Sequence, residues 1–118
     1  MPRRLTDWLK KQALRELTAA VERHCEAAGA CCTSISIKDT ATRWGSCSSS
    51  GALSFSWRLI LAPPYVLDYL AAHEVAHLKE MNHGPRFWRL TAQLTRDAEY
   101  AKEWLRENGP SLHRFGKK

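Results

Sequence analysis

The run from Tyr65 to Trp88 contains two histidines and a glutamate whose types and spacing suit metal-dependent hydrolysis. His73, Glu74 and His77 form the pattern H-E-x-x-H. On a helix, residues four apart differ by about 40° around the axis, so the two histidines project from one face. Both imidazoles can then reach a single cation at about 2.0–2.1 Å. Glu74 would lie beside that cation, placed to take a proton from water that the metal activates. The competing interpretation is an amphipathic core helix with surface histidines.

A catalytic zinc ion is typically held by three protein groups, and His83 is the candidate for the third. A helix that continued through Met81 would place His83 on the wrong side, so the chain must turn first. Asn82 and Gly84 tolerate the backbone of such a turn, and Pro85 suits the first position of a following helix. Three neutral imidazoles would leave the full charge on one Zn²⁺ ion, whose bound water ionises near pH 7.

Composition predicts one globular domain over residues 1–118, with 44% apolar residues and a net charge of +6. No apolar run approaches the roughly 20 residues of a membrane span, and no secretory signal is recognisable. We therefore expect a cytoplasmic protein with no membrane partner. The basic residues are dispersed, which favours a solvated surface and supports nucleic-acid binding only weakly. Four cysteines without a C-x-x-C pair favour buried free thiols over a disulfide framework: Cys25, Cys31, Cys32 and Cys47.

Hydrophobic periodicity predicts an α+β fold with a leading helix, about three short strands, the motif helix and two further helices. The predicted helices are 3–28, a motif helix that opens at 63–64, 85–95 and 97–108, and the predicted strands are 33–38, 43–47 and 53–59. The last two strands are expected to pair as an antiparallel hairpin. Gly109 and Pro110 are expected to end the last helix. The apolar side chains expected to face the core are Leu5, Trp8, Leu9, Leu14, Leu17, Val21, Leu53, Phe55, Trp57, Leu59, Leu61, Leu67, Leu70, Ala71, Leu78, Met81, Phe87, Leu90 and Leu94.

The histidine spacing invites comparison with the metzincins, whose third histidine has the same offset. Here Glu80 occupies their glycine position, and no methionine follows His83, which argues against membership. A second resemblance covers most of the chain, from about residue 3 to 115. It rests on separated motifs in order: Arg43-Trp44-Gly45-Ser46-Cys47, Leu53-Ser54-Phe55-Ser56-Trp57-Arg58-Leu59, His73-Glu74-Val75-Ala76-His77-Leu78, Asn82-His83 and Phe87-Trp88.

These motifs resemble the YgjP-like metallopeptidases, zincin-type proteins distantly related to the SprT group. The resemblance implies that His73, His77 and His83 are zinc ligands and that Glu74 is the catalytic acid and base. Members of that family commonly carry a strand-rich segment before the first helix, whereas this chain begins at the helix, as expected of a minimal or shortened form.

The leading functional prediction is a zinc peptidase that acts on a peptide or protein, with an edge strand ending near Leu61 aligning the substrate. A nucleoside triphosphate pyrophosphohydrolase and a SprT-like nucleic-acid-associated protease or binding module are the alternatives. Arg43 and Arg58 are expected either to steady an oxyanion or to anchor the sheet. The tryptophans at 44, 57 and 88 are expected to be core residues, and Gly45 is expected at a strand bend or close packing.

Overall fold

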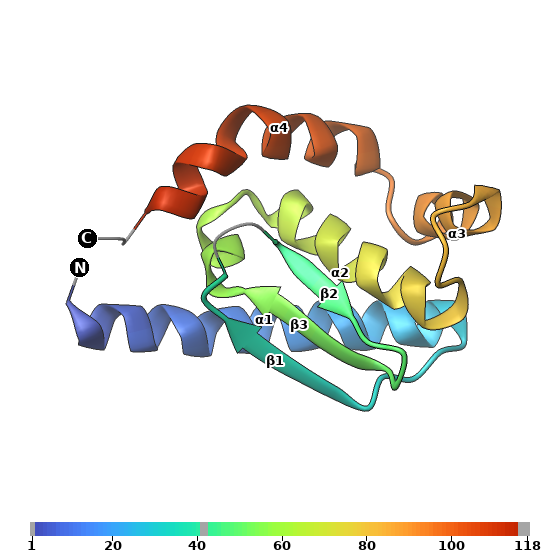
Figure 1. Ribbon diagram of the computed structural model, residues 1–118, viewed down its shortest axis with the longest axis horizontal. Helices are drawn as coiled ribbons and strands as arrows, with labels where there is room; N and C mark the ends of the chain where they lie inside the picture. Colours follow the sequence, from blue (N-terminus) through green and yellow to red (C-terminus); the bar gives the residue numbers. More distant parts are fainter. Residues whose placement is uncertain (1, 41–42, 116–118) are drawn as a thin grey trace.

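The computed structural model describes residues 2–40 and 43–115 and has the predicted α+β fold, with four α-helices and one small sheet in the described part (Figure 1). The predicted single domain also includes residues 1, 41–42 and 116–118, which lie outside the described residues, and its boundaries stay a prediction. In chain order the elements are α1 (Arg3–Ala28), β1 (Ser34–Lys38), β2 (Gly45–Cys47), β3 (Ala52–Ser56), the 3₁₀ helix η1 (Trp57–Leu61), α2 (Pro64–Lys79), α3 (Pro85–Leu94) and α4 (Ala98–Arg114).

The sheet has the order β1-β3-β2, so β3 is the central strand and β2 lies at an edge. β2 pairs with β3 antiparallel, with Gly45 opposite Phe55, which confirms the predicted hairpin. β1 pairs with β3 in parallel, with Ile37 opposite the same phenylalanine. The prediction that the strand ending near Leu61 is an edge strand was therefore wrong, because β1 and β2 occupy both sides of β3.

β3 also ends earlier than its alternating pattern predicts. The strand stops at Ser56, and the chain continues as η1. The Ser56 hydroxyl accepts a hydrogen bond from the backbone N–H of Arg58 at 3.2 Å, which fixes the start of this turn. Trp57 and Leu59 are buried as predicted, because η1 packs against α1 and α2, but Leu61 is 38% exposed.

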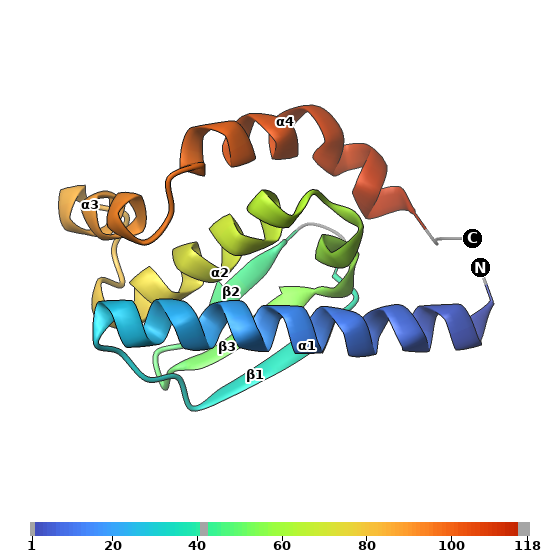
Figure 2. The ribbon, with the colours of Figure 1, turned by 180° about the vertical axis from the view of Figure 1, so that it is seen from behind.

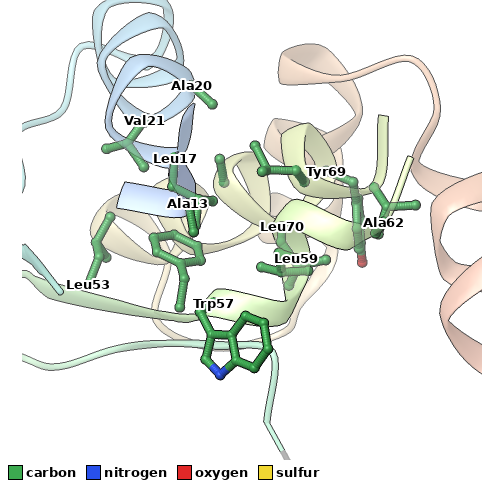
Figure 3. Close-up of a cluster of buried hydrophobic side chains, with 14 of the residues drawn as sticks. Ala13, Leu17, Ala20, Val21, Leu53, Trp57, Leu59, Ala62, Tyr69 and Leu70 are labelled. Carbon is green, nitrogen blue, oxygen red and sulfur yellow. The ribbon is translucent and has the colours of Figure 1, made fainter. Parts of the chain in front are cut away.

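The core lies between the sheet and two helices, α1 and α2, that cover the same face of it (Figures 1 and 2). Figure 3 shows side chains from α1, β3, η1 and α2 that meet there. The central part of α1 supplies the apolar face, and Gly29 ends this helix with φ of 68°, as predicted. The buried side chains that the figure labels include Leu17, Val21, Leu53, Trp57, Leu59 and Leu70.

Several predicted core positions are exposed. Leu5 is 44% exposed at the start of α1, which extends past the other elements that cover the core (Figure 2). Trp8 and Leu14 are 56% and 42% exposed although a neighbour of each on the helix is buried, so they lie off its core-facing side. Met81 lies beyond the end of α2 and is 52% exposed, whereas Leu67, Leu70 and Ala71 are buried on that helix. Phe87 is fully buried, as predicted. Three more of the predicted core residues are only partly buried: Leu78, Leu90 and Leu94.

The end of α4 differs from the prediction. The helix does not stop at Gly109 and Pro110 but continues to Arg114, with the proline inside it. Gly109 lies against the Trp44 ring, where a Cβ would be 3.4 Å from Cζ2, and His113 contacts the same ring at a centroid distance of 3.7 Å. Packing on Trp44 therefore offsets the backbone hydrogen bond that proline removes.

The four cysteines are free thiols, as predicted, but Cys31 is exposed and the other three are only partly buried. Among the helices of the described residues, none is both long and apolar enough to span a lipid bilayer.

Candidate metal centre

α2 places the first two predicted ligands. Pro64 occupies the first turn, where its missing N–H costs no hydrogen bond, and the helix then runs unbroken to Lys79. His73 and His77 are one turn apart, and their ring centroids are 5.0 Å apart. His77 is 9% exposed. Its burial lowers its pKa, which favours the neutral imidazole that a metal requires.

The turn after α2 returns the third predicted ligand to the same place. The backbone is extended at Glu80, and α3 begins at Pro85. His83, which lies between them, brings its Nε2 atom to 2.9 Å from Nε2 of His77. One nitrogen from each of the three predicted histidines lies within 4.8 Å of the other two. A tetrahedral zinc site requires nitrogens about 3.3–3.4 Å apart, so small side-chain rotations would suit the group to one ion.

Hydrogen bonds orient two of the imidazoles. Nδ1 of His77 lies 3.2 Å from the backbone oxygen of Glu80, which can only accept a hydrogen bond. His77 therefore carries its proton on Nδ1, and the lone pair of its Nε2 faces the cluster. Nδ1 of His73 lies 2.9 Å from Oε2 of Glu74, which leaves the other nitrogen of His73 for a metal. This is the arrangement that partners of metal-bound histidines commonly have.

Glu74 is held between α2 and β2. It is 3% exposed, and Gly45 faces it across the interface. A Cβ at Gly45 would lie 3.1 Å from Cγ and Oε2 of Glu74 and 3.2 Å from Cδ1 of Phe55. The glycine is thus needed for close packing, one of the two roles expected of it, and this packing sets the position of the carboxylate.

A cavity of about 340 Å³ opens in front of these groups. One wall is β2 and the residue Arg43 before it, and the other is formed by α2 and the turn that follows. The lining residues that carry the argument are Arg43, Gly45, Ser46, Glu74, His77 and His83. The predicted ligands and the predicted base therefore face a space that a substrate can enter.

The edge of β2 that lines this cavity has no backbone partner among the described residues. Ser56 donates to the Trp44 oxygen and Ser48 donates to the Ala52 oxygen, both at 2.9 Å, so Trp44 and Ser48 face β3. Hydrogen-bonding direction alternates along an antiparallel strand. Gly45 and Cys47, which lie one residue inside these pairs, must therefore point their N–H and C=O groups away from β3.

Comparison with known families decides the assignment. The sequence profile described as "YgjP-like, metallopeptidase domain" matches residues 1–108. The chain belongs to this family. The resemblance drawn from the sequence motifs is confirmed, and this YgjP-like chain is assigned in general to the metallopeptidases. Neither the curated proteins nor the solved structures contain a significant match.

Two arginines in the sequence motifs of this YgjP-like domain have separate surroundings. Arg58 is 1% exposed, forms an ion pair with Asp39, and donates from Nε to the Phe115 oxygen at 2.9 Å. It anchors the end of the sheet and does not line the histidine cavity. Arg43 is exposed and does line that cavity. Arg58 thus has the sheet-anchoring role, one of the two alternatives, whereas the oxyanion role stays a prediction for Arg43.

The aromatic surroundings of the histidines were only partly foreseen. Phe87, fully buried, packs its ring 4.3–5.0 Å from the ring centroids of all three. Trp88 was predicted to be core but is 37% exposed and stacks on His83, with Lys102 Nζ 4.1 Å from its ring centroid. Trp57 is buried and Trp44 is partly buried. The Phe87-Trp88 pair among the YgjP-like motifs was the sequence signal for these aromatic contacts with the histidines.

Proposed function

We propose that this protein is a zinc-dependent peptidase with Glu74 as its general base and acid. The observation that carries the proposal is the cluster of His73, His77 and His83 beside a buried carboxylate in one cavity. Imidazole ligands of this number and spacing suit zinc. Zinc, when bound, supplies a Lewis acid that makes water a competent nucleophile near neutral pH.

The residues of the chain have distinct tasks in this proposal. Glu74 accepts the proton of the attacking water and later delivers it to the leaving amine. His73 contacts Oε2 of Glu74 at 2.9 Å and so fixes the position of the carboxylate relative to the three histidines. The low exposure of Glu74 and His77 limits competing hydrogen bonds from bulk water.

The free edge of β2 is the proposed binding surface for the substrate backbone. The outward N–H and C=O groups of Gly45 and Cys47 can pair with an extended peptide, which would add a strand to the sheet beside the histidines (Figure 1). This replaces the strand ending near Leu61 as the predicted substrate-aligning edge. Main-chain pairing selects an extended peptide without selecting its sequence.

The test is cleavage of a mixed peptide library, read by mass spectrometry. We expect the zinc-loaded protein to cleave, a chelator to stop cleavage, and added zinc to restore it. Glu74→Gln should bind zinc as the wild type does and cleave at least about 100-fold more slowly, because it lacks the base. Full cleavage by Glu74→Gln would refute the role of Glu74, and cleavage that persists without metal would refute the zinc site.

A further inference from the structure

A second, smaller cavity lies at the end of the sheet beside the histidine cavity. Its volume is about 150 Å³, well below the roughly 300–1,000 Å³ of pockets that enclose whole small ligands. It is therefore suited to one functional group. Two cations, Lys38 and Arg43, and four hydroxyl side chains line it: Thr40, Ser46, Ser54 and Ser56. The Thr40 hydroxyl already donates to the Arg43 oxygen, so the cations and the serines are the donors that a ligand could use.

No carboxylate lines this cavity within the described part of the chain. The nearest in sequence, Asp39, is engaged by Arg58, whose hydrogen bond holds the pKa of Asp39 below its usual value. Neither Lys38 nor Arg43 forms a side-chain ion pair with any residue that the structure describes. Two positive charges thus face the cavity without a neutralising partner.

A buried hydroxyl adds a directed donor. Ser56 is 1% exposed, and its oxygen accepts from the backbone N–H of Arg58. Among the described residues, no acceptor takes the proton of this hydroxyl. A buried polar proton without an acceptor is unfavourable unless a ligand or water supplies one. An anion in the cavity would do so.

The small cavity adjoins the proposed substrate site. Arg43, Gly45 and Ser46 line both cavities. Ser46 pairs with Ser54, on the sheet face opposite the core. A peptide paired with the edge of β2 would point alternate side chains toward that same face. One of its side chains would therefore lie beside Ser46 and point toward Lys38 and Arg43.

We infer that this cavity is a specificity subsite for a carboxylate side chain of the substrate, so that the enzyme prefers peptides with Asp or Glu beside the scissile bond. The inference rests on the proposed peptidase function. Arg43 is placed for bidentate contact with the carboxylate, and Lys38 contributes charge from β1. The buried Ser56 hydroxyl donates a hydrogen bond to the same carboxylate.

The experiment measures binding of paired octapeptides to zinc-loaded Glu74→Gln, so that turnover does not interfere. The peptides carry Glu or Gln at one position, moved in steps along the sequence. At one position we expect the Glu peptide to bind about tenfold more tightly, as one charge-assisted hydrogen bond would give. Adding Lys38→Gln and Arg43→Gln should reduce this ratio to about twofold or less. The matched charge control, Arg4→Gln with Lys11→Gln on exposed positions of α1, should retain it.

Equal binding of Glu and Gln peptides at every position would overturn the subsite. So would a Glu preference that survives loss of both cations, or one lost equally in the α1 control. Tight binding of a nucleoside triphosphate through Lys38 and Arg43, with no Glu preference, would also overturn it. Library cleavage by the wild type separates the two proposals: cleavage without an acidic preference refutes only the subsite, and Glu-selective binding without any cleavage refutes only the peptidase.

Discussion

Gly45 on β2 and Glu74 on α2 are in such close contact that even a methyl group at position 45 would crowd the carboxylate. The Cβ that any other residue would add at position 45 would lie 3.1 Å from Oε2 of Glu74. The edge strand that we expect to bind the substrate backbone is therefore also the surface that positions the proposed base. In the proposed mechanism, this one contact would couple substrate alignment to proton transfer.

Gly45→Ala should separate these roles from metal binding. The added methyl group must displace either the Glu74 carboxylate or the Phe55 ring, at a cost of about 1–3 kcal/mol in unfolding free energy. We expect peptide cleavage to fall at least about tenfold while zinc content stays near that of the wild type. Gly84→Ala is the control, because nothing lies within 4 Å of the added Cβ and φ is −91°. Cleavage by Gly45→Ala at the wild-type rate would contradict the positioning role.

His83→Ala should lower zinc affinity at least about 100-fold, because only two imidazoles would remain. Elemental analysis of dialysed protein should show about one equivalent of zinc in the wild type and much less in the variant. Asn82→Ala is a suitable control, since this neighbour is exposed and no non-glycine residue in the described chain needs positive φ. Equal zinc content in the wild type and His83→Ala would remove His83 from the ligand set.

Phe87→Ala should destabilise the metal-free protein by about 3–5 kcal/mol, because the ring is fully buried against all three histidines. Trp88→Ala should cost less, since that ring is 37% exposed. Urea unfolding in the presence of a chelator measures both. A larger loss of unfolding free energy for Trp88→Ala than for Phe87→Ala would show that the exposed Trp88 ring, and not the buried Phe87 ring, supports the three histidines.

Asp39→Asn should make the protein less stable at pH 7, with an effect that disappears in acid. The hydrogen bond from Arg58 holds the pKa of Asp39 below its ordinary value of about 3.9. A depressed pKa in the folded state stabilises the fold above that value and ceases to do so as pH falls through the folded pKa. The unfolding free energies of wild type and variant, measured with denaturant, should therefore begin to converge near pH 3.9 and become equal below the folded pKa. Asp7→Asn, which removes an exposed carboxylate 4.0 Å from Arg3, should change little at either pH.

Local patterns in the sequence predicted most elements and the family. The four-residue spacing of His73 and His77 places them on one face of any helix, and the run around Pro85 predicted the turn that returns His83. The alternation in residues 53–59 predicted a strand, which forms over Ala52–Ser56, and the expected antiparallel pairing with the strand before it is confirmed. These features depend on backbone geometry over a few residues, so they can be read without knowing what each element packs against.

Contacts between distant segments decided the rest. β3 is central because β1, nearly 20 residues earlier, pairs with its second edge, as Ile37 opposite Phe55 shows. α4 continues through Pro110 because Gly109 and His113 pack on Trp44. The close approach of Gly45 to Glu74 likewise joins two elements that no local pattern relates. Periodicity determines which side chains share a face, whereas only packing determines which faces meet, because that choice depends on the shape and volume of residues far apart in the chain.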